Sequence, residues 1–356
     1  MIAQQILIFR CLVLLTCVFL TTGCASLDYY SQSIRGQFEL VQKRQKINVL
    51  LAQKEIPVTL RKKLKTVLEL RNFSINQLNL PNNDSYLSYV DLERKYVIWN
   101  IFATEEFSLT PITWCYLVVG CLDYRGYFAE SEARLEANNL REQDYDIYLG
   151  GVSAYSTLGW FDDPVLNTMM QWSDIRLATV MFHELAHQQL YIKNDTEFNE
   201  AYAETVATIG VNMWLQQNVD KNQAKNFMLA QEREKQFISL IMKYKEMLND
   251  VYQSEESIKF MRQSKKDLFQ RMSDEYILLS RDWENNHYAN WFATEINNAK
   301  LTAIVTYKRL VPALIEIYEK MDRDLIQLYE FCELLSNCDR EKRRDILEKR
   351  EIKFEC

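Results

Sequence analysis

The sequence predicts an α+β fold that is dominated by helices, with a small mixed sheet and an extended helical C-terminal half. Only 8 glycines and 5 prolines occur in 356 residues, so few positions break regular structure. Runs of aromatic and β-branched residues are concentrated between 90 and 155, whereas helical patterns occupy the chain on both sides. We therefore expect one small sheet inside a helical protein.

The first 23 residues have the pattern of an export signal. The apolar run CLVLLTCVFL follows a single basic residue, Arg10, and is too short to span a bilayer comfortably. TTGC then places small residues before Cys24, an arrangement that resembles a bacterial lipoprotein signal with Cys24 as the lipidated first residue. Ala25, rather than Asp, follows, which favours the outer over the inner membrane. An uncleaved N-terminal anchor is the alternative, and both place the chain in the bacterial cell envelope, facing the periplasm.

The expected elements of the first half follow in order. We predict helices over 29–52 and 57–76, with Pro57 in the first turn of the second. KYVIWNIFAT (95–104) and TWCYLVVGC (113–121) are predicted strands, and RGYF (125–128) is a predicted turn.

The next elements lead to the most informative part of the chain. A short helix is expected over 131–142, a strand over 145–152 and a long loop over 153–164. The segment 173–192 is a predicted helix with Ser173 as its cap.

A second helix is expected over 196–217, capped by Asp195 or Thr196, and helices continue through 221–281 and 288–333. The expected division is residues 24–215 as the catalytic region and 216–356 as a helical region packed on the same domain, which offers a surface for a protein partner.

The cysteines outside the signal suggest two local disulfides. Cys115 and Cys121 are six residues apart, as are Cys332 and Cys338, and an exported protein meets an oxidising compartment. We expect these two pairs, with Cys356 left free; unpaired buried thiols are the alternative. The net charge of −7 and the lack of any basic tract argue against a nucleic-acid partner.

HELAH, residues 183–187, carries two of the three histidines of the chain. Residues four apart lie on one face of a helix, so His183 and His187 can direct one nitrogen each at a single zinc ion. Glu184 is positioned to act as a base on water beside that ion. A surface helix that merely carries two imidazoles is the competing interpretation.

The following helix offers the remaining carboxylates. Glu200 and Glu204 in NEAYAE are four apart, and the short connection allows this helix to return to the histidines. We expect Glu200 to be the third ligand and Glu204 to orient His183 through its second ring nitrogen. A solvated acidic face is the alternative, but AYAETVATIG is too apolar for a surface stripe.

HELAH followed by NEAYAE resembles the glutamate-zincin metallopeptidases, which implies a zincin-like domain with one Zn²⁺ per chain. Nearly the whole mature chain is similar to a bacterial family described as putative aminopeptidases, typically predicted lipoproteins. The segments that carry this second resemblance are TWCYLVVGCLDYRGYF, GGVSAYSTLGWFDDPVLNTM, FHELAHQQLYIKNDTEFNEAYAE and INNAKLTAIVTYKRLVPAL. The resemblance implies a membrane-anchored zinc peptidase that acts on peptides or proteins.

The developing oxyanion of such a reaction needs a hydrogen-bond donor. Tyr307 is the preferred candidate because one of the family-like segments surrounds it, and Tyr288 and His287 are the alternatives.

Five further residues are candidates for substrate binding. Arg125 flanks the expected cleft, and a strand that ends in Gly150 and Gly151 can pair with an extended peptide. Asp162 and Asp163 can hold a substrate ammonium group, which would favour an aminopeptidase; a turn before Pro164 explains them equally. The remaining alternatives are a zinc endopeptidase and an inactive envelope lipoprotein that binds or assembles other proteins.

Overall fold

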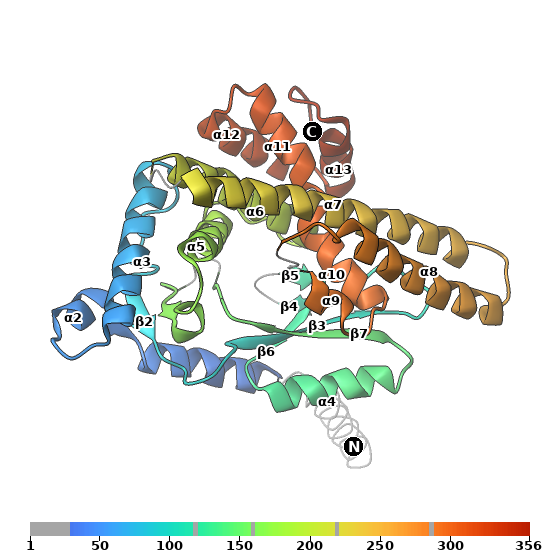
Figure 1. The fold of residues 1–356 in the computed structure, drawn as a ribbon, viewed down its shortest axis with the longest axis horizontal. Helices are drawn as coiled ribbons and strands as arrows, with labels where there is room; N and C mark the ends of the chain where they lie inside the picture. Colours follow the sequence, from blue (N-terminus) through green and yellow to red (C-terminus); the bar gives the residue numbers. More distant parts are fainter. Residues whose placement is uncertain (1–28, 117–119, 158–160, 218–220, 285–287) are drawn as a thin grey trace, which may run out of the picture.

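The computed structural model describes residues 29–116, 120–157, 161–217, 221–284 and 288–356. Helices make up most of it and surround small sheets of two or three strands, which confirms the predicted α+β class (Figure 1). The predicted signal of residues 1–23 and the predicted lipid site Cys24 lie outside the described residues. No helix in the described part of the chain is both long and apolar enough to cross a membrane.

The N-terminal helical region differs from the prediction at one point. The first helix covers residues 29–42, and the chain then turns extended as β1 (Gln45–Lys46) before α2 (Ile47–Ala52) begins. The single helix predicted over 29–52 was therefore wrong, because β1 pairs with β2 (Ser88–Val90) and this tertiary pairing overrides local helix propensity. The prediction of the next helix is confirmed by α3 (Val58–Asn76), with Pro57 at its cap.

The central sheet has the strand order β6-β3-β7 and is antiparallel. Its middle strand, β3 (Ile98–Thr104), and its edge strand, β7 (Asp146–Val152), were both predicted. The turn predicted over 125–128 was wrong: β6 (Arg125–Tyr127) pairs with β3, so its backbone groups are satisfied in a ladder. Helix α4 (Glu130–Arg141) packs against this sheet.

The predicted strand over 113–121 is a hairpin instead. Its arms are β4 (Trp114–Tyr116) and β5 (Gly120–Leu122), and Cys115 faces Cys121 across it. The predicted disulfide between these two cysteines is present.

Two helices of the core follow a short crossover. Strand β8 (Val165–Leu166) runs parallel to β2 and leads through the 3₁₀ turn η1 (Asn167–Met169) into α5 (Asp174–Gln189). The predicted Ser173 cap of α5 is present, since its hydroxyl accepts a bond from the Arg176 amide at 3.2 Å. Helix α6 (Thr196–Gln217) packs closely along α5. Gly210 permits this approach, because a methyl group there would lie 2.8 Å from the Phe182 ring.

The C-terminal half contributes a hairpin and a group of shorter helices (Figure 1). The hairpin consists of α7 (Lys221–Tyr252) and α8 (Ile258–Leu279), which enclose their own apolar cluster. The shorter helices are α9 (Ala289–Phe292), α10 (Asn298–Lys308), α11 (Val311–Lys320), α12 (Leu325–Ser336) and α13 (Arg340–Lys349). Residues of α11, α12 and α13 share the main core with α3, α5 and α6.

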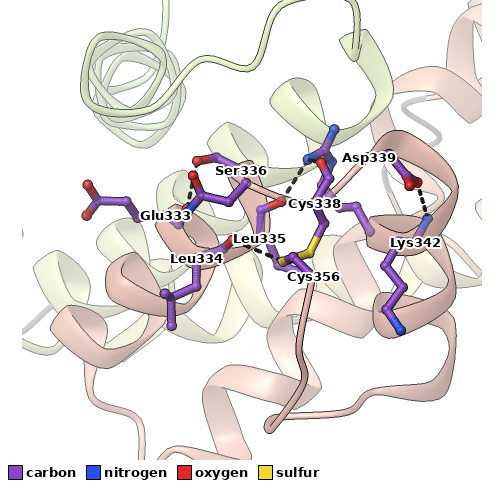
Figure 2. Close-up of a disulfide and its surroundings, with 10 residues drawn as sticks. Glu333, Leu334, Leu335, Ser336, Cys338, Asp339, Lys342 and Cys356 are labelled. Atoms are coloured by element: carbon purple, nitrogen blue, oxygen red, sulfur yellow. Dashed lines mark hydrogen bonds between the residues drawn. A yellow bond between two sulfur atoms is a disulfide. The ribbon is translucent and has the colours of Figure 1, made fainter.

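The second disulfide differs from the prediction. Cys338 pairs with Cys356 near the C-terminus (Figure 2). Cys332, in contrast, is a free, buried thiol. The predicted pair Cys332–Cys338 and the free Cys356 were therefore wrong. Cys332 belongs to α12 and is buried in the core, whereas Cys338 lies just beyond the end of that helix. Six residues of helix correspond to a rotation of about 240°, so the Cys332 side chain points in a different direction from residues at the helix end.

Candidate metal centre

Helix α5 brings its two histidines together, one turn apart. The Nε2 atoms of His183 and His187 lie 3.1 Å from each other, and the rings are nearly perpendicular, at 85°. His187 is buried, and its Nδ1 atom has no hydrogen-bond partner among the described residues. The two imidazoles therefore converge on one point.

Helix α6 adds a carboxylate at the same point. Oε2 of Glu200 lies 3.2 Å from Nε2 of His183 and 3.5 Å from Nε2 of His187. Zinc bonds of 2.0–2.1 Å in a tetrahedron place ligand atoms about 3.3 Å apart. The three atoms thus fit the corners of a zinc site, and in the described part of the chain this group is the one in which several potential metal ligands meet.

The charges of the group also suit a cation. Burial lowers the pKa of His183, but hydrogen bonds to Glu200 and Glu204 outweigh it and raise that pKa to about 10. Burial raises the pKa of Glu200, but His187 and His183 outweigh it and lower that pKa to about 2. Without a metal the group therefore retains a proton between acid and imidazole, which a metal ion would replace.

Glu204 lies behind the group. Its Oε2 atom is 3.5 Å from Nδ1 of His183, the ring nitrogen that faces away from the convergence point. Lys308 of α10 forms an ion pair with Glu204 and a second one, at 3.0 Å, with Glu234 of α7. Burial raises the pKa of Glu204, but Lys308 and His183 hold it well below its ordinary value. Glu204 can therefore fix the orientation of the His183 ring.

Glu184 is half-buried, and its negative charge influences two tyrosines, Tyr307 and Tyr124. Burial raises the pKa of Tyr307 well above its ordinary value, and the negative charges of Glu200 and Glu184 add to this effect. The same two glutamates act on Tyr124, which lies between β5 and β6. The sequence pointed to Tyr307 but gave no sign of Tyr124, because a turn tyrosine far away in the chain is indistinguishable among 20 tyrosines.

Two other candidates, Arg125 and Tyr288, are engaged elsewhere. The Arg125 guanidinium lies 4.2 Å from the centre of the Tyr29 ring and 3.3 Å from the Glu136 carboxylate. Tyr288 stacks on Phe237 in the cluster of the α7–α8 hairpin, with 3.9 Å between the ring centres. His287 lies outside the described residues.

The two adjacent aspartates differ in their environments. Asp163 is buried and accepts hydrogen bonds from Ser156, from both the amide and the hydroxyl of Thr157, and from Gln188 of α5 at 3.3 Å. Burial raises its pKa to about 6 despite these bonds. Asp163 thus anchors its own loop to the metal-binding helix, whereas Asp162 is exposed.

The glycine pair lies in β7, opposite Asn100 and Trp99 of β3. Among the described strands, β7 has a partner on one side only. On its other edge Asn297 donates to the Ile147 carbonyl at 3.0 Å, so an extended peptide could pair only with the remaining part of that edge, toward Gly151. A side chain at Gly151 would meet the Tyr96 ring at 2.5 Å, which explains a glycine there by packing alone.

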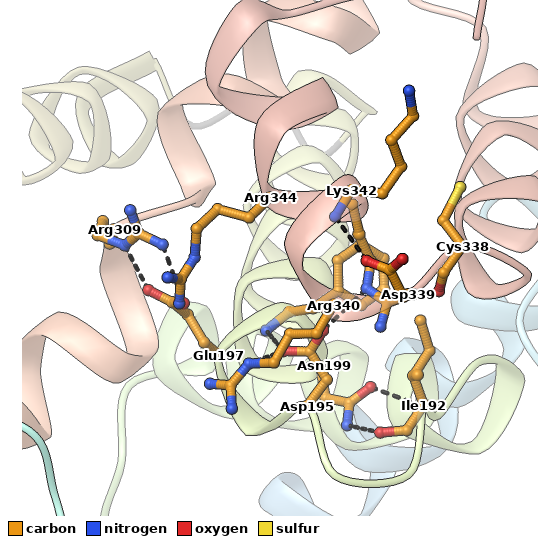
Figure 3. A network of polar contacts seen from close by, with 12 residues as sticks. Ile192, Asp195, Glu197, Asn199, Arg309, Cys338, Asp339, Arg340, Lys342 and Arg344 are labelled. Carbon is orange, nitrogen blue, oxygen red and sulfur yellow. Dashed lines mark hydrogen bonds and ion pairs between the residues drawn. The ribbon is translucent and has the colours of Figure 1, made fainter. Parts of the chain in front are cut away.

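Two acids at the start of α6, Asp195 just before it and Glu197 in its first turn, pair with arginines rather than with histidines (Figure 3). Oδ2 of Asp195 accepts a bond from Nε of the buried Arg343 at 2.8 Å. Glu197 pairs with Arg344 at 2.9 Å and with Arg309. Glu197 is therefore bound to arginines of the C-terminal region and not to the histidines.

The comparisons with known proteins bear on this site. A family model described as "Putative aminopeptidase" matches residues 28–347. Neither the curated proteins nor the solved structures give a match.

Proposed function

The chain belongs to the putative aminopeptidase family, and we propose that it is a zinc-dependent peptidase that removes residues from the N-terminus of peptides. The observation that supports this most directly is the convergence of His183, His187 and Glu200, whose ligand atoms lie 3.1–3.5 Å apart. These three residues would hold one zinc ion and leave a fourth position open for water or substrate.

When bound there, zinc supplies a Lewis acid that activates water and polarises the scissile carbonyl group. Glu184 follows His183 on the helix and accepts a proton from the attacking water, which it then donates to the departing amine. Tyr307, whose hydroxyl remains protonated because burial raises its pKa, donates a hydrogen bond to the oxyanion. The free edge of β7 holds the peptide in an extended conformation.

Attachment to the envelope is a separate part of the proposal. It rests on the signal pattern and on Cys24, and the expected location is the periplasmic face of the outer membrane. Labelling with palmitate tests it: wild type should incorporate the label and Cys24→Ser should not. Equal labelling of both proteins would contradict the lipid anchor.

The deciding experiment compares wild type with Glu184→Gln in metal content and in hydrolysis of free and N-acetylated peptides. We expect about one zinc per chain in both proteins and a rate that falls at least 100-fold in the variant. Glu246→Gln, an exposed position of α7, is the matched control and should behave as wild type. Hydrolysis of acetylated peptides at equal rates would make the protein an endopeptidase, and zinc without hydrolysis of any peptide would favour a binding or assembly protein.

A further inference from the structure

Asp123 lies in the turn between β5 and β6, in a segment that tertiary contacts hold against the metal-binding helices. The side-chain oxygen of Asn194, in the connection between α5 and α6, accepts a bond from the Cys121 amide at 2.8 Å. Gly120 adopts a left-handed conformation (φ 82°), and a side chain there would meet Asn194 at 2.4 Å. Cys115–Cys121 closes the hairpin in turn. These contacts fix the turn that contains Asp123 next to the start of α6.

The Asp123 carboxylate is buried and lacks a direct partner. Its exposed fraction is 8%, and none of the described residues forms a hydrogen bond or an ion pair with it. Burial raises its pKa, and the negative charges of Glu197, Asp195 and Glu200 raise it further. Arg340 opposes this shift, but Arg340 is half-exposed and lies 3.7 Å from a different acid, Asp195.

Neighbouring residues place Asp123 near the metal-binding helices. Tyr124, the next residue, packs with Tyr307 of α10 against one apolar cluster, and Lys308, which follows Tyr307, pairs with Glu204 of α6. The turn that carries Asp123 therefore lies between the α5–α6 connection and the part of α10 that contacts α6. A buried carboxylate without a partner costs free energy, and such groups are typically matched by a cation. Among the described residues, no Lys, Arg or His side chain lies within hydrogen-bond distance of the Asp123 carboxylate.

We propose that Asp123 binds the α-ammonium group of the substrate and thereby fixes cleavage at the first peptide bond. In an N-terminal residue the ammonium nitrogen is separated from the scissile carbonyl carbon by the Cα atom alone, so a carboxylate beside the metal ligands is in the right region. Asp163 cannot serve in this way, because its oxygens are occupied by Ser156, Thr157 and Gln188. This inference rests on the proposed peptidase function and specifies its substrate class.

The test compares wild type with Asp123→Asn on a peptide anilide and on the same compound without its α-amino group. The variant should lose at least about 100-fold in kcat/KM on the amine, while its rate on the des-amino compound stays within about twofold of wild type. Zinc content should not change. Asp250→Asn, an exposed position of α7, is the control. A variant that keeps the wild-type preference for the free amine overturns the proposal.

A second measurement separates failure of this inference from failure of the proposed function. Calorimetry of the zinc-loaded proteins would compare leucinamide with 4-methylpentanamide, which lacks only the amine. Wild type should prefer leucinamide at least about tenfold and Asp123→Asn should not, even if no peptide is hydrolysed. No preference in wild type, or the same preference in both proteins, overturns the inference. A second zinc ion bound by wild type and lost in the variant would instead identify a metal ligand.

Stability provides a check on folding. Replacing a buried, unpaired carboxylate by a neutral amide should leave the thermal unfolding midpoint of Asp123→Asn unchanged or higher. A residue with a structural role would lower it. Asp123→Ser serves as a second variant with the same expectation, and a fall in the midpoint of both variants would contradict the functional role.

Discussion

Helix α6 carries two sets of buried acids that differ in what neutralises them. At its first turn, Asp195 and Glu197 pair with arginines of α10–α13 and their flanking residues (Figure 3). One turn later, Glu200 faces two histidines. Arginine does not lose its proton in proteins, so the first set is permanently paired. Histidine can exchange its proton for a metal ion, so the second set can change state. The difference separates a structural junction from a site that is ready for a ligand.

The largest difference in zinc binding and stability should appear when one glutamate of each set is changed to glutamine. Glu200→Gln should abolish zinc binding at micromolar metal, well beyond the roughly 10–100-fold cost of losing an outer carboxylate. Glu197→Gln should keep the zinc but lower the free energy of unfolding, because two arginines lose their partner. Metal analysis after dialysis and denaturation with urea measure the two effects. Equal zinc loss in both variants would contradict the distinction between a structural set and a metal-binding set of acids.

Arg343→Met tests the structural set alone. Removing this side chain leaves Asp195 buried without its closest cation, and breaking a buried pair typically costs about 3–5 kcal/mol. Arg343 also donates to the carbonyl groups of Leu335 and Cys338, at 2.8 and 2.9 Å. Urea unfolding of the zinc-free protein should show the loss, and the double variant with Asp195→Asn should recover part of it. An unchanged unfolding midpoint would contradict the assignment.

Glu204→Gln addresses the residue that links the two kinds of pairing, since Glu204 contacts both His183 and Lys308. We expect zinc affinity to fall roughly 10–100-fold, because His183 loses the carboxylate that orients its ring. Competition with a chromophoric chelator measures the affinity. Wild-type affinity in this variant would assign Glu204 to the structural set.

The smallest effect is a pH dependence of the zinc-free protein. His183 has a folded pKa of about 10, above the unfolded value of about 6.5, so the stability it contributes is complete below pH 6.5 and is lost as the pH rises through 10. The unfolding midpoint of wild type should therefore fall between pH 6.5 and 9.5 relative to that of His183→Gln. Parallel curves for the two proteins would show that the acid–imidazole pairing is absent in solution.

Local patterns predicted the elements that carry the metal group. The HELAH spacing placed His183 and His187 on one helical face, and Ser173 marked the start of that helix. Periodicity also distinguished the helical C-terminal half from the strands of the central sheet. These features depend on residues a few positions apart, so a single sequence contains the information.

Features that depend on distant contacts escaped prediction. The turn of Asp123 and Tyr124 lies near the metal-binding helices because its hairpin docks on the α5–α6 connection, and no local signal marks that contact. The arginines that pair with Glu197 come from more than 100 residues away, and β1 forms only because β2 is available to it. The strand at 125–127 was read as a turn for the same reason, since its ladder partner lies in β3.

The unpaired cysteine of α12 has a consequence for how the chain matures. Three sulfurs, those of Cys332, Cys338 and Cys356, belong to the same C-terminal region, and a thiolate at Cys332 would be able to attack the neighbouring bond and shuffle it. Burial raises the pKa of Cys332 far above its ordinary value, so the attacking species is almost absent once the core has formed. Packing around α12 therefore slows disulfide exchange, because the buried Cys332 thiol cannot act as the nucleophile that attacks the Cys338–Cys356 bond.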